Sequence, residues 1–93
     1  MYHFYVLYSL KDGRIYKGST GALLTRIEQH NSGRTKSTKH RRPLLLLYYE
    51  AYETKEAAYS RERWSKTLEG GSELRTLLVA KSLLTEEGAL KLG

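Results

Sequence analysis

The side chains best suited to chemistry are two tyrosines, an arginine, a histidine and a glutamate. Tyr5 and Tyr16 stand in neighbouring aromatic segments, Arg26 follows ten residues after Tyr16, His30 comes four residues later, and Glu62 lies much further along. Tyrosine and histidine transfer protons, a guanidinium binds phosphate through paired hydrogen bonds, and one carboxylate holds a divalent cation. Together these groups have the chemistry to hydrolyse a phosphodiester, whereas each alone has an ordinary structural role.

The pattern of apolar residues predicts the elements that position these groups. Strands are expected over 3–10 and 14–18, joined by the turn Lys11-Asp12-Gly13, and a third strand follows Pro43 over 44–52. The four leucines of the third strand predict burial on both of its faces. The order β-β-α-β-α-α predicts an α/β (α+β) fold, in which helices flank a three-stranded, mostly antiparallel sheet.

Three helices are expected between and after these strands. The first spans 21–32, with Ser19 or Thr20 as its N-cap and Gly33 after its end, and it places Arg26 and His30 on neighbouring faces. Thr54 is expected to cap the second helix, which ends near residues 70–71.

The second helix places Ala58 and Glu62 on one face, and Trp64 is expected in the core. Ser72 is expected to cap a third helix that extends toward Leu84. The last ten residues form either a short helix or a frayed end.

Positive charge is concentrated in one third of the chain. Between Arg14 and Arg42 there are eight basic residues and one acid, a balance of +7, whereas the rest has eight basic and nine acidic residues. The overall +6 therefore lies between residues 14 and 42, which indicates a polyanionic partner such as a nucleic acid. The alternative is a solvated basic loop, over 33–42, that only maintains solubility.

Length and composition exclude several other classes. Ninety-three residues predict one domain, 1–93, and the lack of cysteine excludes disulfides, thiolate nucleophiles and cysteine-based zinc sites. The longest apolar run, 44–49, is too short to span a membrane, and no secretory signal stands at the amino terminus, so a cytoplasmic protein is expected. The oligomeric state is left open.

The spacing of the candidate residues resembles the GIY-YIG nuclease superfamily from about Tyr2 to Leu78. His3-Phe4-Tyr5 takes the place of Gly-Ile-Tyr, and Tyr16-Lys17-Gly18 that of Tyr-Ile-Gly. The chain is most similar to small single-domain bacterial members, akin to the nuclease domain of the UvrC excision-repair subunit. It departs from that pattern at His3, which replaces a glycine, at Lys17, which replaces an aliphatic residue, and at Ser19, where UvrC-type domains have a lysine.

The resemblance implies a role for each candidate residue. Arg26 matches the catalytic arginine and Glu62 the glutamate that binds Mg²⁺ or Mn²⁺, while Tyr5, Tyr16 and His30 complete the predicted catalytic set. Of the two tyrosines, Tyr5 is favoured to take the proton of the attacking water. A further set is expected to contact DNA, and it comprises Lys17, Ser19, Asn31, Arg34, Lys36, Ser37, Thr38, Lys39 and Arg42.

The sequence therefore predicts a metal-dependent endonuclease that cleaves DNA, structure- or strand-selective, in DNA repair or processing. The main alternative is a non-catalytic nucleic-acid-binding module that uses the basic loop and exposed tyrosines as stacking platforms. A weaker alternative is a protein-interaction domain with an incidental basic face. Cleavage in Mg²⁺ and not in EDTA separates the enzyme from the binder, and salt-sensitive affinity argues against the third class.

Overall fold

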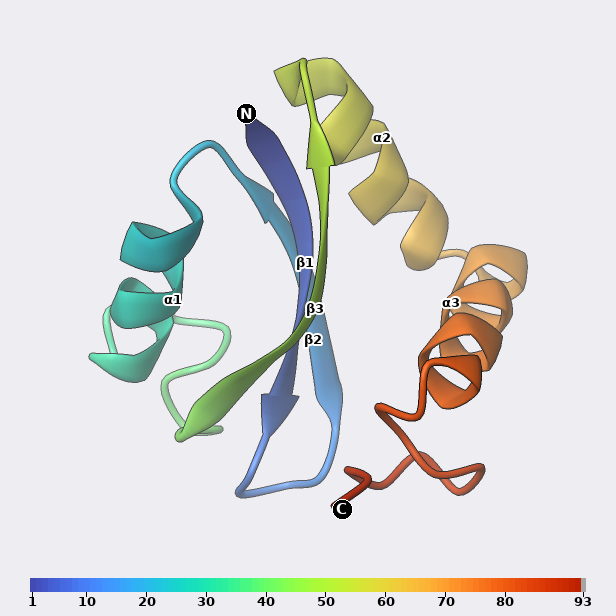
Figure 1. Cartoon of the computed structure of the whole chain (residues 1–93). Coiled ribbons are helices and arrows are strands. Elements are labelled where there is room, and N and C mark those ends of the chain that lie inside the picture. Colours follow the sequence, from blue (N-terminus) through green and yellow to red (C-terminus); the bar gives the residue numbers. More distant parts are fainter. Residues whose placement is uncertain (93) are drawn as a thin grey trace.

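The computed structural model describes residues 1–92 as an antiparallel sheet between one helix and two others (Figure 1). The strands are β1 (Tyr2–Ser9), β2 (Ile15–Thr20) and β3 (Leu44–Tyr52), and their order in the sheet is β2-β1-β3. Helix α1 (Leu23–Asn31) covers one face, and α2 (Lys55–Ser65) and α3 (Leu68–Ala80) lie on the other. This arrangement confirms the predicted fold class.

The alternation of side chains along the central strand β1 divides the core into two parts. Phe4, Val6 and Tyr8 point toward α3 and pack with Leu74 and Leu78. Tyr5 and Leu7 point to the other face, where they pack with Leu44 and with Leu23 and Ile27 of α1. Because successive residues of a strand face opposite sides, the strand that carries Tyr5 is anchored from both faces of the sheet.

Strand β3 differs from its prediction, although its bounds agree with the sequence analysis. It was expected to be buried on both faces, but it is an edge strand and Leu44 is its only fully buried residue. Leu45 is 43% exposed and Tyr49 is 53% exposed. The physical reason is that β3 lies at the edge of the sheet, so no further strand covers its outer side and its side chains are packed from the β1 side alone.

The N-caps of α1 and α3 differ from their predictions, whereas that of α2 agrees. Helix α1 has Ala22 at its N-cap, because the Thr20 hydroxyl accepts the backbone N–H of Ala22 at 3.1 Å and forms a turn ahead of the helix. Thr54 caps α2 as predicted, and its hydroxyl accepts the N–H of Ala57 at 3.1 Å. Thr67, not Ser72, caps α3.

The glycines at 70 and 71 lie inside α3 instead of ending α2. A Cβ at Gly70 would lie 1.8 Å from the carbonyl oxygen of Trp64, so the tight turn between α2 and α3 requires a glycine at this position. Trp64 itself is 41% exposed, contrary to its predicted core position, because α2 turns Ala58 and Ser65 toward the sheet.

Helix α2 is fixed to the sheet by a network around Glu50 of β3. The Glu50 carboxylate accepts hydrogen bonds from the hydroxyls of Tyr48 and Tyr52 and forms an ion pair with Arg61 at 2.8 Å. The Arg61 guanidinium also lies over the Phe4 ring at 4.7 Å. Because Arg61 is held on two sides, the next residue, Glu62, has a defined position.

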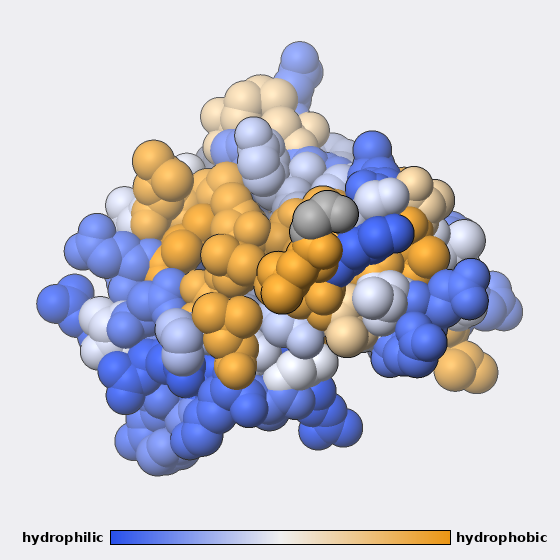
Figure 2. Space-filling view, turned by 60° about the horizontal axis from the view of Figure 1, so that its bottom comes forward, coloured by the Kyte–Doolittle hydropathy of each residue, from blue (hydrophilic) through white to orange (hydrophobic). Residues whose placement is uncertain are grey.

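The chain after α3 is neither helical nor frayed over residues 81–92. Leu84 is buried and pairs with Leu90 in an antiparallel bridge, and this closes the core below α3. Figure 2 shows the end of the molecule that was at the bottom of Figure 1, where apolar side chains gather in the middle of a hydrophilic rim. No helix among the described residues is long and apolar enough to cross a membrane.

Candidate functional site

A buried chain of three polar side chains lies between the sheet and α1. The Tyr5 hydroxyl is 2.8 Å from Nε2 of His30, and Nδ1 of His30 is 2.7 Å from Oγ1 of Thr38. Tyr5 is 1% exposed, and His30 and Thr38 are fully buried. The ring of Tyr16 lies against His30 with centroids 5.0 Å apart, so both predicted tyrosines meet at the predicted histidine.

The electrostatics of this chain hold it in its neutral form. Burial lowers the pKa of His30 to about 4, and the nearby Arg26 guanidinium adds to this effect. Burial also raises the pKa of Tyr5 to about 12, although Arg26 partly offsets the rise. Both side chains are therefore uncharged near neutral pH, and Tyr5 on its own is a poor source of phenolate.

Arg26 lies at the Tyr5 end of this chain of hydrogen bonds, and its guanidinium has only donors to offer the Tyr5 oxygen. The direction of the two bonds follows the tautomer of His30. With the proton on Nδ1, His30 donates to Thr38 and Nε2 accepts from the Tyr5 hydroxyl. Arg26 is also hydrogen-bonded to Gln29 at 3.2 Å, within α1. The first helix thus supplies Arg26 and His30 to the same place, as their spacing predicted.

Gly18 has a steric role at this point of the edge strand β2. A Cβ at Gly18 would lie 2.5 Å from the Tyr5 hydroxyl oxygen, which is closer than real side chains approach. Tyr5 and Gly18 are directly opposed in the β1–β2 ladder. The glycine that ends the second motif therefore leaves the space into which the Tyr5 hydroxyl fits.

Glu62 lies on the α2 side of the same edge strand. Its carboxylate accepts a hydrogen bond from Ser19 at 2.7 Å and from the Lys66 ammonium at 2.6 Å. The Glu62 side chain is 15% exposed, whereas that of Lys66 is 51% exposed. Ser19 follows Gly18 on β2, so the carboxylate reaches the edge strand next to the residue that opposes Tyr5. Its negative charge is the smallest contributor to the raised pKa of Tyr5, after burial.

The chemistry of this donor set fits a hard cation with a single protein ligand. Within residues 1–92, no three His, Asp or Glu side chains gather as a metal cluster. Mg²⁺ characteristically keeps several waters and takes further ligands from phosphate, so one carboxylate is sufficient. Lys66 pairs with the Glu62 carboxylate, but its side chain is half-exposed to solvent. A cation that binds Glu62 would therefore displace a solvent-accessible ammonium group.

The basic loop, residues 33–42, presents part of the predicted DNA-binding set to solvent. Its exposed members are Arg34, Lys36, Ser37, Lys39 and Arg42. Ser37 is also 3.5 Å from the Tyr16 hydroxyl, which joins the loop to the catalytic set. These positions agree with a role in contacting phosphates.

The four other residues predicted to bind DNA are engaged within the protein. Thr38 is fully buried beneath the loop and is bonded to His30, so its side chain has no surface to offer. The Asn31 side chain donates to the carbonyl of Leu44 at 2.8 Å and accepts its N–H at 2.7 Å. Lys17 donates to the carbonyl of Ser65 at 2.7 Å, and Ser19 bonds Glu62. For Thr38, which is buried, the structure replaces the predicted contact with a structural role, whereas Asn31 stays exposed at the end of α1.

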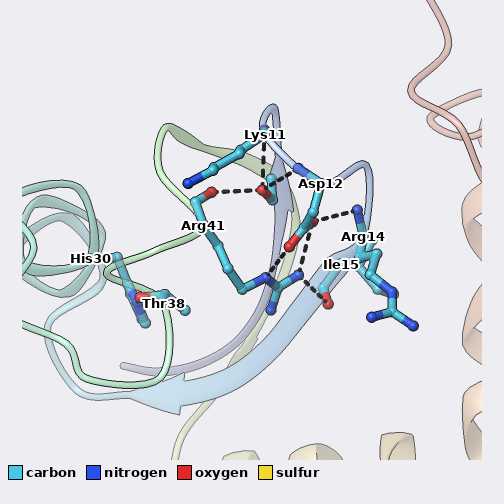
Figure 3. A network of polar contacts seen from close by, with 8 residues as sticks. Lys11, Asp12, Arg14, Ile15, His30, Thr38 and Arg41 are labelled. Carbon is cyan, nitrogen blue, oxygen red and sulfur yellow. Dashed lines mark hydrogen bonds and ion pairs between the residues drawn. The ribbon is translucent and has the colours of Figure 1, made fainter.

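A second polar network ties the end of the basic loop to the β1–β2 turn (Figure 3). The Arg41 guanidinium forms an ion pair with Asp12 at 2.6 Å, and the hydrogen bonds from Arg41 lower the pKa of Asp12 to about 2. The Ser9 hydroxyl donates to the carbonyl of Arg41 at 2.6 Å and accepts the N–H of Lys11 at 3.2 Å. Arg41 is thus a loop anchor.

Sequence reasoning missed the roles of Thr38 and Arg41. The pairing of Lys66 with Glu62 was open to prediction, because the two residues lie four apart on one helix and such pairs meet. Thr38 and Arg41 carried no such signal, since their partners lie 8 and 29 residues away and are reached only when the loop has folded.

Comparison with known proteins shows the family to which the chain belongs. The family model of the GIY-YIG catalytic domain matches residues 1–71, and the chain belongs to this nuclease family. UPF0213 proteins of Staphylococcus aureus strains Mu50 and N315 are each 41% identical to it over 76 residues, which cover 81% of this chain and 93% of theirs. A solution NMR structure of a UPF0213 protein from Bacillus halodurans is 32% identical with a TM-score of 0.49, and the match covers 83% of this chain and 85% of that one.

Proposed function

We propose that this protein is a Mg²⁺- or Mn²⁺-dependent endonuclease that hydrolyses DNA phosphodiester bonds. The observation that carries the proposal is the convergence of the Tyr5–His30 pair, Arg26 and Glu62 on one point of strand β2, at Gly18. Family membership supports a nucleic acid as the substrate. Glu62 would hold the metal ion, which when bound supplies an acidified water and neutralises phosphate charge.

The other side chains have distinct parts in the proposed reaction. Arg26 binds the scissile phosphate and offsets the charge that develops on it. Tyr5 acts as a proton relay: its oxygen accepts the proton of the attacking water while its own proton passes to Nε2 of His30. The arriving phosphate favours this transfer, because a nearby negative charge raises the low pKa of His30.

In this relay Tyr5 takes the proton of the attacking water without first being a phenolate, since burial raises its pKa to about 12. Tyr16 is only half-buried and reaches Ser37 of the basic loop, so it orients the water or the phosphate.

The exposed cations of the basic loop support selectivity for the shape or strandedness of DNA rather than for a long sequence. Long basic side chains such as Arg34, Lys36 and Lys39 are suited to phosphates, and phosphate contacts position a nucleic acid without reading its bases. An activity of this kind suits DNA repair or processing.

The decisive variant is Glu62→Gln, tested on labelled single strands, duplexes, flaps and junctions of DNA and RNA. Glutamine retains the size of the side chain and the hydrogen bond from Ser19 but removes the charge that a hard cation requires. We expect wild-type cleavage in Mg²⁺ or Mn²⁺ and none in EDTA. Glu62→Gln should lose cleavage and retain nucleic-acid binding.

Glu69→Gln is the matched control, because Glu69 is an exposed acid in the first turn of α3, away from the predicted catalytic set. It should cleave at the wild-type rate. Wild-type cleavage by Glu62→Gln would refute the metal role of Glu62, and binding without cleavage by the wild-type protein would favour the non-catalytic alternative.

A further inference from the structure

A groove of about 660 Å³ lies between β2, the start of α3 and the C-terminal segment. Arg14 and Lys17 line it from the β1–β2 hairpin, Arg75 lines it from α3, and Glu87 lines it from the C-terminal segment. Arg75 belongs to the part of the chain whose overall charge is close to zero. The fold therefore brings Arg75 next to Arg14 and Lys17, although Arg75 lies outside the positively charged segment of residues 14–42.

The cations of this groove are not neutralised by neighbouring acids. Arg14, Lys17 and Arg75 form no ion pair with any other residue among 1–92, and Glu87 is the one acid among the lining residues. Burial lowers the pKa of Lys17, and the charges of Lys66 and Arg75 lower it further. Such repulsion among like charges is relieved when an anion enters.

The groove lies next to the proposed catalytic point, and Lys17 connects the two. Lys17 and Ser19 lie two residues apart on the same face of β2, which places them about 7 Å apart. Ser19 bonds the Glu62 carboxylate, and Lys17 bonds the carbonyl of Ser65. Ser65 in turn donates its hydroxyl to the carbonyl of Glu62 at 2.6 Å. Lys17 of the groove is therefore linked to Glu62 through Ser65 and lies beside Ser19, which bonds the Glu62 carboxylate.

The basic loop and the groove lie on opposite faces of the sheet, with edge strand β2 between them. The loop is packed with α1 through Thr38 and His30, whereas the groove is bounded by α3. Figure 1 shows α1 and α3 on opposite sides of the strands. A strand of nucleic acid that crosses the edge at Gly18 would meet positive charge before and after the cleaved position.

We infer that the groove between β2 and α3 is a second phosphate-binding site, which holds the backbone of the substrate strand on one side of the cleaved bond. This inference rests on the proposed nuclease function, because it takes the substrate from it. The basic loop holds the backbone on the other side.

The test is the double variant Arg14→Ala/Arg75→Ala, whose binding to labelled DNA is measured in EDTA over a range of salt concentrations. Loss of two phosphate contacts should reduce the slope of log K against log salt by about 1.4 to 1.8. At 0.1 M salt this corresponds to a roughly 25- to 60-fold loss of affinity. The effect should be present for strands of about 16 nucleotides, which are long enough to reach both cationic surfaces.

Two further variants make the result specific. Arg14→Lys/Arg75→Lys retains both charges and should restore most of the slope of log K against log salt. This restoration separates the loss of charge from a general loss of folding. Arg63→Ala removes an exposed arginine that lies over Tyr59 on α2, outside the groove, and it should bind as the wild type does.

An unchanged slope in the double alanine variant would overturn the groove assignment and leave the proposed cleavage reaction intact. Failure of the wild-type protein to cleave any substrate would instead refute the proposed function, while the binding measurement would still decide whether the groove holds phosphate.

Discussion

The buried His30 should make the stability of this protein depend on pH in a narrow window. Its pKa is lowered from 6.5 to about 4 in the folded protein. Between these values the unfolded chain binds a proton that the folded protein does not, so the free energy of unfolding rises with pH. The contribution is fully present above about pH 6.5 and is lost as the pH falls through 4.

The magnitude follows from the size of the shift. His30 is fully buried, so solvent does not screen the effect. Lowering the pH from 7 to 5 should cost about 2 kcal/mol, and lowering it to 4 about 3 kcal/mol, from this residue alone. That is a large fraction of the stability of a small domain, roughly 5 to 15 kcal/mol.

Urea unfolding at a series of pH values measures this dependence, since the slope with denaturant is not expected to change. His40→Gln is the control, because His40 is exposed in the basic loop. His30→Gln should flatten the profile between pH 7 and 5. Should that variant fail to fold, NMR titration of the His30 ring in the wild-type protein gives the same answer, and a pKa near 6.5 would refute the reasoning.

Three further predictions concern the site and its surroundings. Gly18→Ala should destabilise the fold by about 1–3 kcal/mol, measured by urea unfolding, and should reduce cleavage, because the new Cβ would displace the Tyr5 hydroxyl. Tyr5→Phe and Tyr16→Phe should each lower the cleavage rate about 100-fold or more, with Tyr8→Phe as the control. Tyr5→Phe should also cost about 1–3 kcal/mol of stability because it leaves Nε2 of His30 unpaired, and full activity in both variants would exclude the hairpin from the chemistry. The last variant replaces the four exposed basic residues of the loop, Arg34, Lys36, Lys39 and Arg42, with alanine. The slope of log K against log salt should fall by about 0.7–0.9 per lost phosphate contact, and each substitution should cost under about 0.5 kcal/mol of stability. An unchanged slope would mean that the loop only maintains solubility.

Much of the architecture was determined by short-range patterns in the sequence. The alternation of apolar residues, the Lys11-Asp12-Gly13 turn and Pro43 placed the three strands within two residues of their observed bounds. Thr54 was recognisable as an N-cap because its hydroxyl serves an N–H only three residues away. The spacing of Arg26 and His30 on one helix was equally local, and so their placement on neighbouring faces was predictable.

Tertiary structure alone decided what depends on contacts between distant segments. The glycines at 70 and 71 resemble a helix end, but the close approach of the Trp64 carbonyl makes Gly70 part of a helix. Thr38 and Asn31 are polar residues that were predicted to contact DNA. Folding turns the Thr38 hydroxyl toward His30, and the Asn31 amide bonds the backbone of Leu44. The protonation states of Tyr5 and His30 likewise follow from burial, which no residue type reveals. Sequence spacing thus indicated which residues form the candidate site, and packing decided the protonation states of Tyr5 and His30.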